Sequence, residues 1–293
     1  MYTYIGINLY VTEDEYQKHY DYIEDIYATY HALTTSYDAL DTSSEFMTNV
    51  YDINRRIGEK IQIDVELYDV FQAAQTYAEL TDNHFQMTLG QPVRIWKNMI
   101  AKTPNEFVVG NAIFIHTYEN EQVESRGEII SVSETSVDIR IGEETKPYVI
   151  DALVYELEVS KADFDEASEA IEALSKNVPR VILEEENNKY YITVEGEEVQ
   201  LDLGALSKGY ATNIVRNYLV NEQVEYFSIS AGSSSIALGK NINRPDQDEI
   251  FIVSLTDPTF SPSIINGYYG IIHVKDNTIA TSGNFEQYTL YEG

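Results

Sequence analysis

The spacing of apolar residues changes several times along this 293-residue chain, and these changes constrain its fold more than any other feature. Residues 13–33 and the segment after Asp64 repeat apolar side chains at helical intervals. Residues 106–160 instead contain three β-branched runs separated by turn residues, a pattern typical of strands. We therefore predict an α+β fold of mixed sheets and flanking helices, in one composite domain over residues 1–293 with a β-rich insertion at 106–160.

Two segments give further local predictions. Residues 84–97 contain a glycine and a proline, so we expect them to be rich in loop before a short apolar piece. Residues 180–201 are predicted to form a hairpin whose turn lies near Glu195 and Gly196.

The chain is strongly acidic, with 49 Asp and Glu residues against 19 Lys and Arg and a formal net charge of −30. Nucleic-acid binding requires basic side chains to neutralise phosphates, so the charge argues strongly against that class and against an anionic membrane surface. A phosphorylated ligand would need a local device: backbone N–H groups, one placed lysine or a divalent cation. The sequence contains no cysteine, which excludes disulfides, thiolate catalysis and cysteine-based zinc sites.

The segment Asp202–Ala211, DLGALSKGYA, is the sharpest candidate for a ligand site. Strand-like alternation precedes it and a helical stripe follows it, so Gly204 and Gly209 lie where the chain turns into a helix. We expect Lys208 in the first helical turn, where the helix dipole disfavours a cation, so its presence suggests an anionic ligand. The competing interpretation is a solvated lysine after an ordinary turn. Asp202 either orients the Lys208 loop or caps its turn.

Two segments rich in glycine and serine follow. Residues 226–239 place Gly232, Ser233 and Ser234 after a buried strand, where their N–H groups could line a phosphate or ribose. Residues 279–288, IATSGNFEQY, place small hydroxyl residues and a glycine between two strands. By itself the first segment is more simply a tight β-turn, and the second is a weak signal.

Taken together and in this order, the segments resemble the FAD:protein FMN transferases, the ApbE-like family of flavin-attaching enzymes. Asp202–Ala211 resembles the family's DLGGIAKGYA, residues 230–239 its NAGGDIxxxG, and residues 280–288 its ATSGDYERY. Two upstream segments also fit, residues 1–10 to the family's MGTxYxITLY and residues 85–96 to its FDPTVGPLVxLW. The resemblance covers nearly the whole chain except residues 102–165.

The chain also departs from the family pattern. Tyr2 stands where the family has glycine, which puts a close approach of flavin in doubt; Gln86 replaces an aspartate, Ser233 a glycine and Gln287 an arginine. The family's HIIDPxTG and DAxxT segments, whose Asp and Thr are metal ligands, have no counterpart before Gly293. The chain is therefore either truncated at its C-terminus or a member that has lost catalysis. We favour truncation, because a sheet that ended there would have an exposed edge.

The resemblance implies Mg²⁺-dependent transfer of FMN from FAD to a Thr or Ser of a target flavoprotein through a phosphoester. It implies Lys208 and Asp202 as catalytic residues and the backbone carbonyl of Ser207 as a metal ligand. The residues that it implies for FAD binding are Met1, Thr3, Phe85, Thr88, Gly204, Lys208, Gly209, Gly232, Ser233, Ser234, Thr281, Ser282 and Gly283. It also implies an extracytoplasmic protein, anchored to the membrane as a lipoprotein in its full-length form.

Without the missing metal ligands, we expect these 293 residues alone to have negligible transferase activity. Two other functions stay open. One is a non-catalytic FAD-binding relative, which Tyr2, Gln86 and the missing ligands favour. The other is an extracellular interaction protein that keeps only the fold, which the β-rich insertion and the 24 tyrosines favour.

Overall fold

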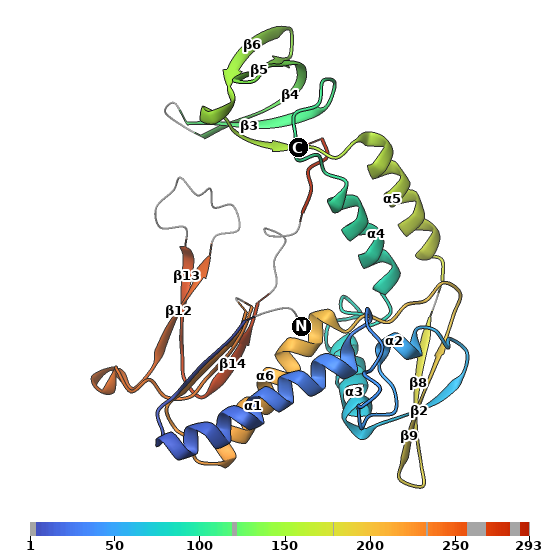
Figure 1. Ribbon diagram of the computed structural model, residues 1–293, viewed down its shortest axis with the longest axis vertical. Coiled ribbons are helices and arrows are strands. Elements are labelled where there is room, and N and C mark those ends of the chain that lie inside the picture. The colour runs from blue at the N-terminus through green and yellow to red at the C-terminus, as the bar shows by residue number, and fades with distance from the viewer. Residues whose placement is uncertain are drawn as a thin grey trace. The chain divides into compact units, whose positions relative to one another are not determined.

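The computed structural model describes residues 4–118, 122–177, 179–232, 234–256, 268–281 and 288–292. The predictions made for Met1, Thr3, Ser233, Ser282 and Gly283 therefore lie outside the described residues. The chain forms two compact units, one from Met1–Gly90 with Val178–Gly283 and one from Gln91–Asn177 with Asn284–Gly293 (Figure 1). Each unit has a hydrophobic core of its own.

A four-stranded antiparallel sheet organises the first unit, in the order β1-β10-β11-β14. Its strands are β1 (Ile5–Leu9), β10 (Phe227–Ala231), β11 (Ser235–Leu238) and β14 (Asn277–Ala280). In β10 the side chains of Phe227, Ile229 and Ala231 are buried and alternate with half-buried residues. This confirms the alternation that the sequence predicts for the strand.

Helix α1 (Glu13–Thr34) begins with a capping box, in which the Thr12 and Glu15 side chains each accept a hydrogen bond from the other residue's N–H. It lies beside α6 (Gly204–Asn221), and α6 packs on β10, β11 and β14 (Figure 1). The helix that carries Lys208 is therefore held between a second helix and the main sheet.

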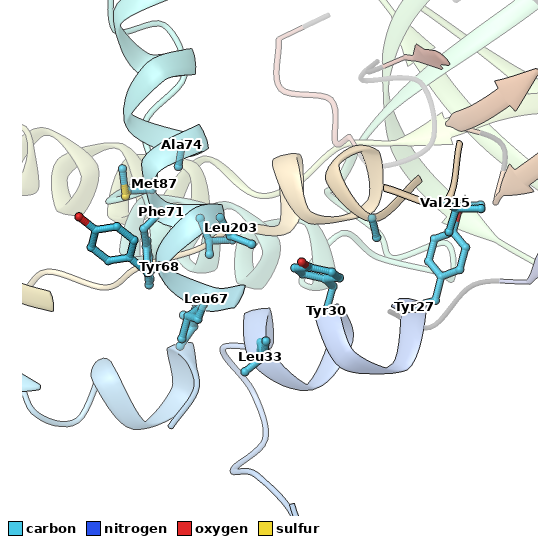
Figure 2. Close-up of a cluster of buried hydrophobic side chains, with 14 of the residues drawn as sticks. Tyr27, Tyr30, Leu33, Leu67, Tyr68, Phe71, Ala74, Met87, Leu203 and Val215 are labelled. Atoms are coloured by element: carbon cyan, nitrogen blue, oxygen red, sulfur yellow. The ribbon is translucent and has the colours of Figure 1, made fainter. Parts of the chain in front are cut away.

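The core of the first unit is rich in aromatic residues, and much of it lies between α1, α6 and α3 (Val65–Leu80). The buried side chains labelled in Figure 2 are Tyr27, Tyr30 and Leu33 of α1, Leu67, Tyr68, Phe71 and Ala74 of α3, and Met87, Leu203 and Val215. Asp64 occupies the N-cap position of α3, but its carboxylate accepts a hydrogen bond from the Met47 N–H instead of capping the helix.

A short helix, α2 (Val50–Ile53), has an asparagine at each end. Asn49 caps its N-terminus by accepting from the Asp52 N–H, and its amide group also donates to the carbonyls of Ala32 and Asp38. Asn54 is the C-cap residue, and its side chain points away from α2 to the backbone of Leu201.

A second sheet of the first unit has the order β2-β9-β8, with β2 (Lys60–Ile63), β8 (Arg180–Glu186) and β9 (Lys189–Glu195). The predicted hairpin forms, but the predicted position of its turn near Glu195 and Gly196 is wrong. Asn187 and Asn188 make the turn with φ of 52° and 60°, because asparagine tolerates the left-handed backbone that a two-residue hairpin loop requires. A separate antiparallel ribbon consists of β12 (Phe251–Thr256) and β13 (Tyr268–Val274).

The second unit contains a five-stranded antiparallel sheet in the order β6-β5-β4-β3-β7. Its strands are β3 (Ala112–Tyr118), β4 (Gln122–Val132), β5 (Ser136–Ile141), β6 (Glu144–Val149) and β7 (Val154–Leu157). Its core consists of the buried residues Ile113, Ile115, Ile129, Val137, Ile139 and Leu157. The strands predicted within residues 106–160 are therefore present.

Two helices, α4 (Gly90–Ala101) and α5 (Lys161–Leu174), flank this sheet in the sequence. The prediction that residues 84–97 are mostly loop is wrong from Gly90 onward. Pro92 is the third residue of α4, where a helix does not need its N–H, so the proline does not prevent the helix. Among the described residues, none of the helices combines the length and apolar character that a bilayer-spanning helix requires.

The contact between α1 and α6 includes a buried histidine. His19 is 4% exposed, and its Nδ1 lies 2.9 Å from the Tyr218 hydroxyl. Burial lowers the pKa of His19, and the nearby Lys18 ammonium acts in the same direction, while the Glu222 and Glu15 carboxylates oppose them. The folded chain therefore favours the neutral imidazole.

This burial predicts a pH-dependent loss of stability. The unfolded chain takes up a proton at His19 below about pH 6.5, whereas the folded chain resists it, so the contribution is complete above that pH and is lost as the pH falls. We expect the free energy of unfolding to fall less steeply from about pH 7 to about pH 5 in His19→Gln than in the wild type. Urea unfolding at several pH values measures this, with the exposed His84→Gln as control. Equal slopes for wild type and His19→Gln would contradict the argument.

Candidate functional site

The predicted turn from strand-like chain into helix lies between Gln200 and Gly204, where α6 begins. The Asp202 carboxylate accepts a hydrogen bond from the Gly204 N–H at 2.6 Å, which closes a turn immediately before α6 begins. In this contact Asp202 caps the turn, which is one of the two roles that the sequence suggests for it. The second carboxylate oxygen makes no hydrogen bond to the residues that the structure describes.

Backbone hydrogen bonds hold the beginning of this turn against residues 85–90. The Asp202 N–H donates to the Met87 carbonyl at 2.8 Å, and the Gly90 N–H donates to the Gln200 carbonyl at 2.9 Å. The segment that contains the candidates Phe85 and Thr88 therefore runs beside the segment that leads to α6. Both candidate side chains are half-buried, and Phe85 packs against the main core.

The predicted glycine and serine segments meet at one end of the main sheet. Ile5 pairs with Ala231, Ala231 with Ser235, and Ser235 with Ala280, so these four residues lie in one row. Just beyond this row, the Gly232 N–H donates to the Tyr4 carbonyl at 2.9 Å and the Thr281 N–H donates to the Ser234 carbonyl at 2.7 Å. Gly232 has a φ of +65°, a conformation that favours glycine.

Helix α6 meets the same end of the sheet. A Cβ atom added to Gly209 would lie 3.7 Å from the Ala280 Cβ, an ordinary van der Waals contact. Lys208 precedes Gly209 in the sequence, and Gly209 packs on Ala280. The next residue, Thr281, donates its N–H to the Ser234 carbonyl. Of the candidates, Gly232, Ser234 and Thr281 lie at this end of the sheet, and Gly209 packs beside Thr281 through Ala280.

Lys208 differs from most basic residues of the chain. It is half-buried, and its ammonium group makes no ion pair or hydrogen bond to any residue that the structure describes. By contrast, Lys18, Lys60 and Lys240 of the same unit each pair with a glutamate. In a chain of net charge −30, a half-buried cation without a carboxylate partner is available to an anionic ligand.

The expected position of Lys208 in the first helical turn is wrong. The helix begins at Gly204, so Lys208 is its fifth residue and lies at the start of the second turn, past the unpaired N–H groups. Its backbone carbonyl accepts from the Thr212 hydroxyl at 2.7 Å, and the Tyr27 hydroxyl lies 2.8 Å from the same Thr212 oxygen. Since Thr212 has a single hydroxyl proton, Tyr27 is the donor to it.

The described residues contain no cluster of metal-binding side chains. Among them, no group of three or more His, Asp or Glu side chains is close enough together to hold a metal ion. Ser207 is 4% exposed and lies inside the continuous helix α6, where its carbonyl faces the next helical turn.

Several residues at this site were not predicted from the sequence. Asn54, Tyr27 and Thr212 contact the segment around Lys208 from elsewhere in the chain or from inside α6. Asn54 and Leu201 are 147 positions apart, and no spacing in the sequence relates them. Gln200 also has a buried side-chain oxygen without a partner among the described residues.

Comparisons of the sequence with a family model and with curated proteins agree on one family. The family model described as the ApbE family matches residues 1–163 and 128–293. The FAD:protein FMN transferase of Klebsiella pneumoniae (strain 342) is 34% identical over 117 residues, which cover 39% of this chain and 31% of the relative. That of Buchnera aphidicola subsp. Schizaphis graminum is 26% identical over 106 residues, which cover 36% of this chain and 29% of the relative. The matched segments thus span less than a third of the curated relatives' length.

Solved structures resemble the whole chain. The ApbE protein from Thermotoga maritima has a TM-score of 0.58 at 19% identity, covering 99% of this chain and 70% of its own. The flavin transferase ApbE from Vibrio cholerae has a TM-score of 0.53 at 15% identity, covering 100% of this chain and 72% of its own. The matches confirm the predicted resemblance and the predicted mixture of helices and sheets.

The space beside Gly90 and beside Gly209 differs, and this difference predicts opposite effects of alanine at the two positions. A Cβ at position 90 would lie 2.6 Å from the Gln200 carbonyl oxygen, so Gly90→Ala must push the two segments apart. We expect it to lower the free energy of unfolding by about 1–3 kcal/mol. Gly209→Ala is the matched helical control; it has room and should leave stability equal or raise it by up to about 1 kcal/mol. Urea unfolding followed by circular dichroism measures both, and a harmless Gly90→Ala would contradict the contact.

Proposed function

We propose, from the premise that this chain belongs to the ApbE family, that it supplies the FAD-binding part of an FAD:protein FMN transferase. The observation that carries the proposal is the half-buried Lys208 without a carboxylate partner among the described residues; its sequence neighbour Gly209 packs on Ala280. The two curated relatives are named FAD:protein FMN transferases, which supports the same activity.

Electrostatics favours this site for the diphosphate of FAD. A diphosphate that approaches a chain of net charge −30 is repelled unless positive charge is concentrated where it binds. In this proposal the Lys208 ammonium supplies that charge, and Gly232, Ser234 and Thr281 are small residues at the end of the sheet on which Gly209 packs.

The proposed reaction is a phosphoryl-type transfer. A Thr or Ser hydroxyl of the acceptor protein attacks the FMN phosphorus, a new P–O bond forms, and the P–O bond to AMP breaks. The hydroxyl proton leaves to solvent or to AMP. The residues of this chain bind and orient the diphosphate, and Lys208 stabilises the negative charge that moves to the leaving oxygen. Asp202 keeps the turn closed so that Lys208 stays in place.

The Mg²⁺ requirement is part of the proposal and rests on the family resemblance. A divalent cation would polarise the phosphorus and stabilise the leaving oxygen. Among the described residues, only the backbone carbonyl of Ser207 is proposed as a ligand, and no group of three or more His, Asp or Glu side chains accompanies it. We also keep as proposals a single flavin-transferase domain over residues 1–293 and an extracytoplasmic, membrane-anchored full-length protein.

A non-catalytic FAD-binding relative is the second candidate function. The absence of a metal-holding group from the described residues favours it, and so do Tyr2 and Gln86, which replace family residues. Both candidates require FAD binding at Lys208 and differ in covalent transfer.

Replacing Lys208 tests the site. Lys208→Met keeps the length of the side chain and removes its charge, so we expect the dissociation constant for FAD to rise at least about tenfold, or about 1.4 kcal/mol. Lys189→Met is the matched control, because Lys189 is an exposed lysine of the same unit that also has no partner among the described residues. Flavin fluorescence titration measures both constants. If both variants bind FAD like the wild type, Lys208 does not hold the diphosphate.

The metal dependence separates the two candidate functions. We expect FAD affinity to change by less than about threefold between Mg²⁺ and EDTA, since the described residues offer no metal-holding group. The transferase predicts covalent flavin on an acceptor domain incubated with this chain, FAD and Mg²⁺, and its loss in EDTA. The non-catalytic candidate predicts little covalent flavin under either condition, so robust transfer that EDTA abolishes would exclude it.

A further inference from the structure

Asn54 makes a two-point contact with the backbone that leads into the Lys208 helix. Its Oδ1 accepts from the Leu201 N–H at 2.7 Å, and its Nδ2 donates to the Leu201 carbonyl at 3.0 Å. One side chain thus satisfies both polar groups of a single residue, as a neighbouring strand would. Leu201 is fully buried, so leaving its N–H and carbonyl without partners would be costly.

This contact does not serve the helix that Asn54 terminates. The backbone N–H of Asn54 donates to the carbonyls of Asp52 and Val50, which completes the end of α2. The side chain is therefore free to face Leu201. The contact therefore acts on the turn before α6.

The turn itself is short, and only Leu201 in its first three residues depends on Asn54 for its backbone hydrogen bonds. The Met87 carbonyl holds the Asp202 N–H, and the Gly90 N–H holds the Gln200 carbonyl. Leu201 lies between these two bonds and is fixed by Asn54. From Asp202 the chain reaches Gly204, where α6 begins, without a further long-range hydrogen bond at Leu203 or Gly204 among the described residues.

We propose that Asn54 is a positioning residue for the FAD site: by clamping Leu201, it fixes the turn that sets the direction of α6 and hence the place of Lys208. This inference rests on the proposed function. Asn54 acts through the backbone, because its side chain is hydrogen-bonded to Leu201 and not to the candidate binding residues.

The other end of α2 offers a matched control. Asn49 is the same residue type, is fully buried, and makes three hydrogen bonds, to the Asp52 N–H and to the carbonyls of Ala32 and Asp38. None of them involves residues 200–208. Asn49→Ala should therefore destabilise the fold at least as much as Asn54→Ala while leaving the turn intact.

The test compares FAD affinity with stability in the two variants. We expect Asn54→Ala to weaken FAD binding about tenfold and Asn49→Ala less than about twofold, at temperatures where both are folded. In the absence of FAD, hydrogen exchange at the Leu201 amide should accelerate in Asn54→Ala relative to Asn49→Ala. If Asn54→Ala does not fold, the isosteric Asn54→Asp, which keeps the acceptor and loses the donor, takes its place and should weaken FAD binding severalfold.

The outcomes separate this inference from the proposed function. A wild-type chain that does not bind FAD overturns the proposed function and this inference with it. A wild type that binds FAD, with Asn54 variants that bind it as tightly or lose no more affinity than Asn49→Ala, overturns the inference alone. Equal Leu201 exchange in the two alanine variants also overturns it, because the clamp would then not hold the turn.

Discussion

The hydrogen bonds around Gln200–Asp202 are the constraint on which the rest of the first unit depends. Two segments distant in sequence, one containing Asn54 and the other Met87 and Gly90, form hydrogen bonds with three successive residues of this stretch. The stretch runs into α6, and α6 packs on both α1 and the main sheet. A backbone fixed in this way cannot shift without breaking bonds to buried groups, so the helix starts at a defined place and in a defined direction.

The second consequence is electrostatic. Most of the described basic side chains on this acidic chain have a carboxylate partner. The partner offsets their positive charge, so they attract an anionic ligand less strongly. Lys208 has no such partner among the described residues. The proposed diphosphate site thus rests on a lysine that no described carboxylate pairs with, in a chain of net charge −30.

Local rules account for the agreements and disagreements between sequence and structure. The alternation of Phe227, Ile229 and Ala231 identified β10, because period-two burial is a property of the strand alone. The predicted turn of the β8–β9 hairpin is wrong because glycine is the usual sign of a turn and Gly196 follows the strand. Two successive asparagines, Asn187 and Asn188, form the two-residue loop instead. The helix at Gly90–Ala101 was missed because a proline near its start is as compatible with a helix as with a loop.

The sequence by itself determined the family, the mixture of helices and sheets, and Lys208 as the cation to consider, because motif order, periodicity and charge are written in adjacent residues. The tertiary structure alone decided that Lys208 opens the second turn of α6, that Gly209 packs on Ala280, and that Asn54 clamps Leu201. The physical reason is that hydrogen bonds and close packing depend on distance in space. A pair of residues 147 positions apart acquires its relation only when the chain between them has folded.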